Sequence, residues 1–204
     1  MTDRFDAPFF ALRIVVGPAF ALSFRPRVVG REHIPKTGAA ILASNHASFL
    51  DPILIGLNAR RPVRFLVSRE FYHDRRLKIL LRLCGTIPVG GRAGMIRSFR
   101  RIAERVGNGE LLGIFPEGGI TRDGAMRPFR SGAAVIALRM GIPVVPMRVG
   151  GTFDALPRHA RWPRFVPLTL GIGEPIGVVA RRDPSSEEID ALTATIRDAV
   201  SRLA

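Results

Sequence analysis

The sequence contains little cysteine and little lysine. The first limits the covalent links and metal sites that the chain can form, and the second means that arginine supplies its positive charge. Cys84 is the only cysteine, so the chain forms no internal disulfide and no zinc site built from cysteines. Lys36 and Lys78 are the only lysines, and the net charge of +14 therefore comes almost wholly from arginine. Such an excess attracts polyanions, which include nucleic acids, anionic lipid head groups and phosphorylated small molecules, and charge alone does not choose among them.

The chain also lacks a long uninterrupted hydrophobic run. The stretch from Ala7 to Phe24 is apolar apart from Arg13 and Ser23, and as one helix it would reach about 27 Å at about 1.5 Å per residue. Arg13 would be costly in the middle of a bilayer, and Pro18 would kink the helix. We therefore expect residues 1–26 to associate with a membrane, either lying in the interface or entering it as a short helical pair.

Two other interpretations of this N-terminal segment remain open. It can be an amphipathic helix that packs on the domain. It can also be a signal peptide cleaved after Ala19-Phe20-Ala21, but Asp3 and Asp6 cancel the basic start that such peptides need.

Residues 27–204 have the length and pattern of one α/β domain. Short apolar runs separated by turns alternate with segments of helical spacing, which predicts a central, largely parallel or mixed sheet flanked by helices. The predicted strands are Ala39–Ser44, Arg64–Ser68, Thr86–Val89, Leu111–Phe115, Val144–Val149 and Leu168–Ile172. The predicted helices are Pro52–Ala59, Arg75–Cys84, Gly94–Val106, Gly132–Met140 and Ser185–Ala204. Residues 150–167, rich in proline, arginine and aromatics, match neither pattern.

The first candidate site is the turn from Asn45 to Asp51. His46 lies where a predicted strand ends, and Asp51 lies where Pro52 begins a predicted helix, so His46 occupies the kind of turn where α/β folds bind ligands. A histidine can accept a proton from a hydroxyl, and Asp51 can orient its imidazole. Alternatively Asp51 only caps the helix, or Ser48 is a nucleophile served by His46, although no Gly-x-Ser-x-Gly elbow surrounds it.

Two further motifs contain glycines beside charged residues. Phe115-Pro116-Glu117-Gly118 follows an apolar run, where glycine lets a backbone approach a ligand and Glu117 offers a carboxylate; it can equally be a plain strand and turn. Gly85 to Arg92 forms a glycine-rich loop before a helix with an arginine stripe. That stripe can meet phosphates or a membrane, or be a solvated face.

These motifs, with Gly141-Ile142-Pro143-Val144-Val145-Pro146, resemble in order and spacing the blocks of the lysophospholipid and glycerol-phosphate acyltransferases, from about Val29 to Val149. The resemblance implies transfer of a fatty acyl group from acyl-CoA or acyl carrier protein to a hydroxyl of a lysophospholipid, most often 1-acylglycerol 3-phosphate, which gives phosphatidic acid. His46 would be the general base and Asp51 would orient it. Acyl-CoA or acyl carrier protein would be a co-substrate, with neither cofactor nor metal.

The resemblance also implies a set of substrate-binding residues. Glu117 and Gly118 would bind the glycerol part of the acceptor, and Arg92 would bind its phosphate. Asn45 and Ser48 would contact substrate from the first motif. The implied partners are the lipid acceptor, the acyl donor and a membrane surface, with no nucleic acid, and the expected location is the cytoplasmic face of the cell membrane, as a peripheral or monotopic protein.

Two departures from the family pattern concern the acceptor. Gly90-Gly91 precede Arg92, which therefore comes one residue late, and Gly119-Ile120-Thr121-Arg122 stands where Thr-Arg is common. The latter form looks more like the branch that contains 2-acylglycerophosphoethanolamine acyltransferases, so lysophosphatidylethanolamine or a lyso-aminolipid is an alternative acceptor. From another class, a basic membrane- or nucleic-acid-binding module without catalysis remains possible, although it would not need a His-Asp pair beside Phe-Pro-Glu-Gly.

Overall fold

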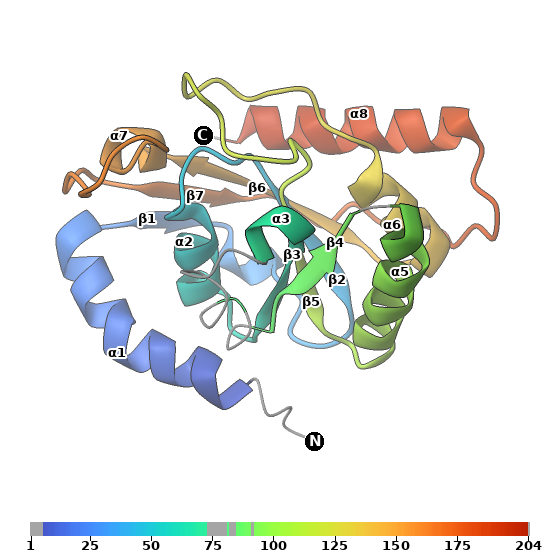
Figure 1. Ribbon diagram of the computed structural model, residues 1–204, viewed down its shortest axis with the longest axis horizontal. Helices are drawn as coiled ribbons and strands as arrows, with labels where there is room; N and C mark the ends of the chain where they lie inside the picture. Colours follow the sequence, from blue (N-terminus) through green and yellow to red (C-terminus); the bar gives the residue numbers. More distant parts are fainter. Residues whose placement is uncertain (1–5, 73–80, 82–84, 91, 204) are drawn as a thin grey trace.

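The computed structural model describes residues 6–72, 81, 85–90 and 92–203, with the backbone alone at 6, 8, 12, 70, 71 and 92–96. The strands are β1 (Arg27–Val29), β2 (Ala40–Ser44), β3 (Val63–Ser68), β4 (Ile87–Val89), β5 (Leu111–Ile114), β6 (Val144–Gly150) and β7 (Thr169–Ile172). Within the described residues they form one seven-stranded sheet in the order β1-β7-β6-β2-β5-β3-β4 (Figure 1). Strands β6 and β7 pair antiparallel and the other neighbours pair parallel, so the sheet is mixed.

The helices are α1 (Asp6–Phe24), α2 (Asp51–Asn58), α3 (Arg69–Tyr72), α5 (Arg92–Gly107), α6 (Gly132–Met140), α7 (Thr152–Ala155) and α8 (Ser186–Arg202), with a 3-10 turn at Arg31–His33. The predicted helix over residues 75–84 lies, apart from Leu81, outside the described residues. Helix α8 begins as the sequence predicts, because Ser185 and Glu188 form a reciprocal capping box.

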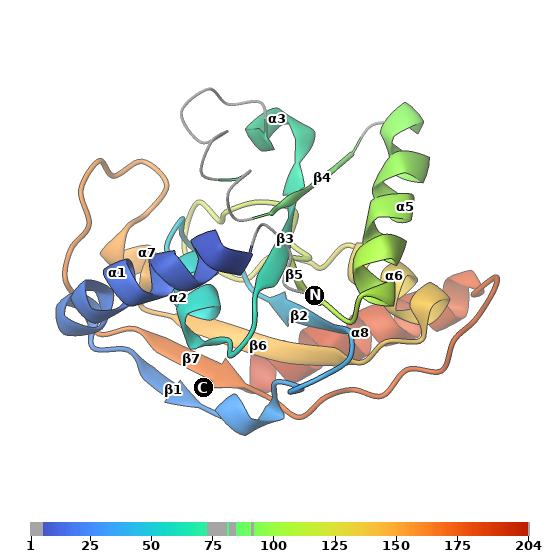
Figure 2. The ribbon, with the colours of Figure 1, turned by 90° about the horizontal axis from the view of Figure 1, so that it is seen from below.

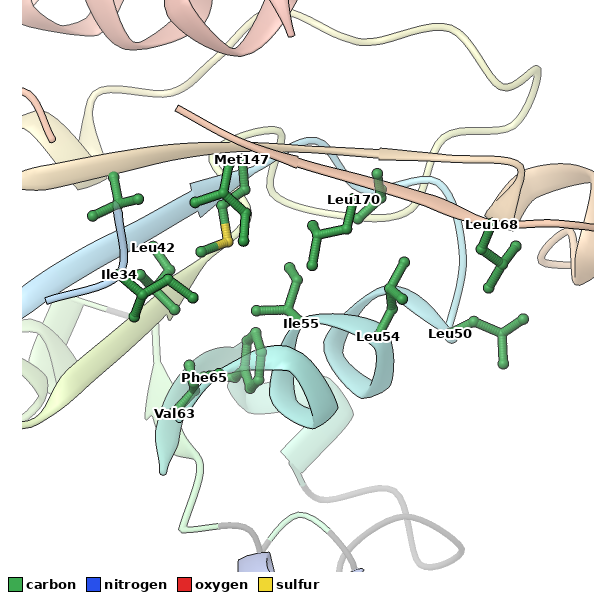
Figure 3. Close-up of a cluster of buried hydrophobic side chains, with 14 of the residues drawn as sticks. Ile34, Leu42, Leu50, Leu54, Ile55, Val63, Phe65, Met147, Leu168 and Leu170 are labelled. Atoms are coloured by element: carbon green, nitrogen blue, oxygen red, sulfur yellow. The ribbon is translucent and has the colours of Figure 1, made fainter. Parts of the chain in front are cut away.

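The sheet separates two hydrophobic cores. Helices α1 and α2 cover one face, where Leu42, Leu54, Ile55 and Leu170 pack together (Figure 3). Helices α5, α6 and α8 cover the other face. Alternate residues of β2 face opposite cores, and all five residues of this central strand are buried. The unbroken apolar run that predicted β2 therefore reflects burial on both sides.

Strand β1 and helices α3 and α7 were not predicted. Strand β1 has three residues, its first and last residues are exposed, and its pairing with β7 forms the edge of the sheet. Helix α7 has four residues and lies in the stretch that matched no pattern. Helix α3 also has four residues, and all three elements are too short to show a hydrophobic period.

Helix α1 is one continuous helix through Pro18, rather than a helical pair. Phe20 and Phe24 are buried against the domain, and Arg13 Nη1 donates to the Ala59 carbonyl at 2.8 Å. Its other face exposes several large apolar side chains, Phe10, Ile14, Val15 and Leu22. Among the described residues, none of the helices has both the length and the apolar character needed to cross a membrane.

Candidate active site

His46 lies in the loop that joins the central strand β2 to α2. The buried carboxylate of Asp51 faces back into this loop, where its Oδ2 accepts from His46 Nδ1 at 2.8 Å and from the backbone N–H groups of Ala47 at 2.7 Å and Ser48 at 2.8 Å. Leu50, and not Asp51, is the N-cap residue of α2. Asp51 therefore organises the histidine loop, and its role is not that of a simple helix cap.

The imidazole of His46 is held in position by aromatic stacking. Its ring lies 3.9 Å from the Phe115 ring, at an interplanar angle of 13°, and Phe115 in turn stacks on Phe65 at 5.7 Å. The side chain is 15% exposed, and within the described residues Nε2 has no hydrogen-bond partner. When Nδ1 carries the proton that Asp51 accepts, the Nε2 lone pair is available for proton transfer.

A second buried carboxylate, that of Glu117, holds the backbone of the same loop. Its Oε1 accepts from the His46 N–H at 2.9 Å, and its Oε2 accepts from the Arg127 N–H at 3.1 Å. The His46 carbonyl accepts from the Thr121 N–H at 3.0 Å. Burial raises the pKa of Glu117, while the two backbone N–H groups and the Arg127 charge oppose this shift. The segment after β5 thus fixes both sides of the His46 backbone.

Asn45 and Ser48, both predicted to bind substrate, are engaged within the chain. The Asn45 amide donates to the Val149 carbonyl at 3.1 Å and accepts from the Val149 N–H at 2.9 Å, which continues the β2–β6 pairing beyond the strand end. The fully buried Ser48 hydroxyl donates to the Leu156 carbonyl at 2.7 Å and accepts from the Leu50 N–H. Because this hydroxyl makes no hydrogen bond to His46, the nucleophile alternative loses its support. Substrate contact by either side chain stays a prediction.

Gly118 and two arginines shape the turn after β5. Gly118 has φ +73°, a backbone conformation that favours glycine, and a Cβ at this position would lie 2.8 Å from Arg130 Cζ, so a larger residue would also displace the Arg130 guanidinium. Arg127 Nη2 donates to the carbonyls of Glu117 and Gly119. Sequence reasoning did not identify Arg127 and Arg130. The signal that was available is the spacing of Arg122, Arg127 and Arg130, which all lie within twelve residues after the Phe-Pro-Glu-Gly motif.

Arg92 is the first residue of α5, and its side chain lies outside the described part of the chain. Its phosphate contact therefore stays a prediction. Of the arginines on α5, Arg97 and Arg101 are exposed, whereas Arg105 forms an ion pair with Glu110 at 2.9 Å. Among the described residues, no group of three or more His, Cys, Asp or Glu side chains is placed to hold a metal ion.

Comparisons with known proteins identify the family of the chain. The family model described as Acyltransferase matches residues 25–150. A chloroplastic 1-acyl-sn-glycerol-3-phosphate acyltransferase of Brassica napus is 28% identical over 160 residues, covering 76% of this chain and 46% of its own length, so the chain spans less than half of that relative. A Bacillus subtilis protein of the same name is 24% identical over 179 residues, covering 87% of each chain. The crystal structure of the 1-acyl-sn-glycerophosphate acyltransferase PlsC from Thermotoga maritima superposes with a TM-score of 0.78 at 27% identity, covering 99% of this chain and 81% of that one.

Proposed function

Because this chain belongs to the acyltransferase family, we propose that it transfers a fatty acyl group from acyl-CoA or acyl carrier protein to the free hydroxyl of a lysophospholipid. The first acceptor is 1-acylglycerol 3-phosphate, whose acylation gives phosphatidic acid. The choice follows the names of the relatives. The observation that carries the proposal is the 2.8 Å contact between His46 Nδ1 and the buried Asp51 carboxylate at the end of the central strand.

The proposed reaction uses His46 Nε2 first as a base and then as an acid. Nε2 takes the proton of the acceptor hydroxyl while that oxygen attacks the thioester carbonyl carbon, and the carbonyl electrons move onto oxygen. When the carbonyl re-forms, the carbon–sulfur bond breaks, and the leaving thiolate takes the proton back from His46. The Asp51 charge stabilises the imidazolium that exists between these two steps.

We assign the acceptor to the turn after β5. Both carboxylate oxygens of Glu117 already accept backbone N–H groups. We therefore propose that Glu117 supports the His46 backbone, and that the exposed Gly118 binds the glycerol part of the acceptor. Arg127 and Arg130, which lie against this turn, supply positive charge for the acceptor phosphate together with Arg92.

The proposed location is the cytoplasmic face of the cell membrane, with α1 as a peripheral or monotopic attachment. The exposed apolar face of α1 supports this assignment, because an unpaired face of Ile14, Val15 and Leu22 favours burial among lipids. Extraction of membranes with high salt and then with carbonate tests it. Full release by salt alone would count against attachment through α1.

The second candidate is acylation of lysophosphatidylethanolamine or a lyso-aminolipid. The observation that favours it is the sequence Gly119-Ile120-Thr121-Arg122, which departs from the pattern common in the family. In the structure Thr121 binds the side chain of Asp123, and its N–H binds the His46 carbonyl, so this part of the turn serves the histidine loop. We therefore expect residues other than Thr121 to select the head group of the acceptor.

The deciding experiment offers the purified protein a panel of lysolipids with acyl-CoA and with acyl carrier protein as donors. We expect transfer to 1-acylglycerol 3-phosphate at the highest kcat/KM. Preference for lysophosphatidylethanolamine would instead select the second candidate. Failure with every acceptor and both donors would refute the acyl transfer itself, and would leave the non-catalytic binding module as the remaining alternative.

A matched variant of Asp51 distinguishes its orientation of the His46 ring from the effect of its negative charge. Asp51 Oδ1 is buried and has no hydrogen-bond partner among the described residues. In Asp51→Asn the amide nitrogen can therefore take that position while the remaining oxygen still accepts from His46. We expect kcat to fall with KM nearly unchanged, since only the imidazolium loses stabilisation. An unchanged kcat would show that the Asp51 charge has no part in the reaction.

A further inference from the structure

Residues 157–167, which join α7 to β7, expose aromatic side chains among arginines. Trp162 is 83% exposed and Phe165 is 70% exposed. Arg158, Arg161 and Arg164 interleave with them, and the segment contains no aspartate or glutamate. We refer to residues 157–167 as the arginine–aromatic loop. Exposure of two large aromatics in one short segment is unfavourable in water, and it marks a surface that another phase or molecule covers.

Backbone hydrogen bonds hold this loop in its exposed conformation. The Arg164 N–H donates to the Ala155 carbonyl of α7 at 2.7 Å, and the Ala160 N–H donates to the Pro157 carbonyl at 2.9 Å. Trp162 thus lies between two fixed points of the chain. Its exposure is a property of the fold and does not result from a loose connection.

The loop lies against the C-terminal end of α1. The Phe165 ring packs edge-on against Phe24, the last residue of α1, at 5.5 Å between ring centres, and the Leu168 N–H donates to the Phe24 carbonyl at 3.1 Å. Figures 1 and 2 both place the loop beside the C-terminal end of α1. Leu22, 79% exposed, lies at the same end of the helix. The exposed Leu22 of α1 and the aromatic side chains of the loop therefore lie at the same end of the molecule.

We propose that the arginine–aromatic loop is a second membrane-contacting element, which places Trp162 and Phe165 at the level of the lipid head groups. Its three arginines bind the phosphates of anionic phospholipids there. Tryptophan prefers this interfacial depth, and arginine keeps its charge with the phosphates while its stem lies along apolar surface. The occupant is an anionic bilayer surface, because the loop combines apolar and basic groups without acidic ones.

The position of the loop also bears on the proposed acyl transfer. The inference rests on that proposed function, because its acceptor is a lipid of the membrane. The loop begins directly after Leu156, whose carbonyl accepts from the Ser48 hydroxyl of the histidine loop. Contact of the loop with lipid therefore brings the His46 turn close to the bilayer surface, where a lysophospholipid presents its hydroxyl.

Trp162 is the only tryptophan of the chain, so its fluorescence reports this loop alone. With vesicles of phosphatidylcholine and phosphatidylglycerol, we expect its emission to shift to shorter wavelength, to be protected from acrylamide and to be quenched by brominated lipid. Protein that sediments with the vesicles while Trp162 emission stays unchanged would overturn the inference. That result would leave both the acyl transfer and the attachment through α1 standing.

Charge-removing variants extend the test. Replacement of Arg158, Arg161 and Arg164 by glutamine is expected to weaken vesicle affinity about 5-fold per arginine, and on the order of 100-fold together. The matched controls are Arg182→Gln and Val179→Ser, both exposed in the segment that runs to the opposite end of the molecule, and they should leave affinity unchanged. Equal losses in the controls, or a Trp162 shift with an oligonucleotide and none with vesicles, would refute the loop as a lipid contact.

Discussion

Two glutamates at the two ends of β5 are held in different ways. Glu110 precedes the strand and accepts from two side chains, from Arg64 Nε at 2.5 Å and from Arg105 Nη1 at 2.9 Å. Arg64 is only 1% exposed. Glu117 follows the strand, and its oxygens accept from backbone N–H groups, one of which is that of His46.

The two glutamates therefore differ in role: the contacts of Glu110 stabilise the fold, and those of Glu117 hold the loop of the proposed catalytic histidine. At the amino end, full charges are paired, which ties β3, the start of β5 and α5 together at one point. At the carboxyl end, Glu117 is held mainly by peptide dipoles, and the nearest full charge, Arg127 Nε, lies 3.6 Å away. Burial therefore raises the pKa of Glu117. The amino end fixes the strands, whereas the carboxyl end fixes one peptide group beside the imidazole to which we assign proton transfer.

Among the variants, removal of the His46 imidazole should have the largest effect on the rate of acyl transfer. In His46→Ala we expect kcat for acyl transfer to fall about 10²- to 10⁴-fold, the range of a lost general base, while the free energy of unfolding changes little. The release of free thiol from acyl-CoA measures the rate, and denaturant titration measures stability. A variant that kept full activity would refute the mechanism and leave the fold untouched.

Glu110→Gln should damage the other end of the strand. Loss of its charge leaves the deeply buried Arg64 less compensated, and we expect the free energy of unfolding to fall by about 3 kcal/mol. Turnover per folded molecule should stay near the wild-type value at low temperature. Glu104→Gln, at an exposed position of α5, is the matched control and should change stability by less than about 0.5 kcal/mol. Equal effects in the two variants would contradict the assigned role of Glu110.

Glu117→Gln tests whether the carboxyl end serves chemistry. One of two buried backbone N–H groups then faces an amide nitrogen, which costs about 1–3 kcal/mol. If that loss falls on the His46 peptide, kcat decreases about 5- to 100-fold while KM for the donor stays nearly constant. If Glu117 has a purely structural role, the variant should lower stability and leave the turnover of folded protein unchanged. That result would show that Glu117 and Glu110 do not differ in role.

The smallest expected effect is the pH dependence of stability. Because the folded-state pKa of Glu117 is raised above its unfolded-state value, the folded chain binds this proton more tightly. Its unfavourable contribution is therefore absent below the unfolded-state pKa, about 4.3, and grows as pH rises through the folded-state pKa. The stability of Glu117→Gln relative to wild type should rise with pH across this window. A difference that fell with pH would contradict the direction of the shift.

Local sequence determined much of this protein. The predicted strands and helices within the described residues begin and end close to the observed bounds. The strands were predictable because β2 and its neighbours are apolar on both faces, and the start of α8 because Ser185 and Glu188 form a capping box. The contact of His46 with Asp51 spans five residues, and a strand end and a helix start enclose both. Short-range spacing was enough to predict this pair. The membrane role of residues 1–26 stays a prediction, although the continuous α1 replaces the helical pair.

Tertiary structure alone decided which groups surround that pair. Phe115 and Glu117 meet His46 because β5 pairs with β2, and Val149 binds Asn45 because β6 pairs with β2 on the other side. Phe165 meets Phe24 across more than half of the chain. No local period encodes strand order, since every buried strand presents a similar apolar run. The sequence thus determined the contact between His46 and Asp51, and the order of strands around β2 decided which residues surround and support it.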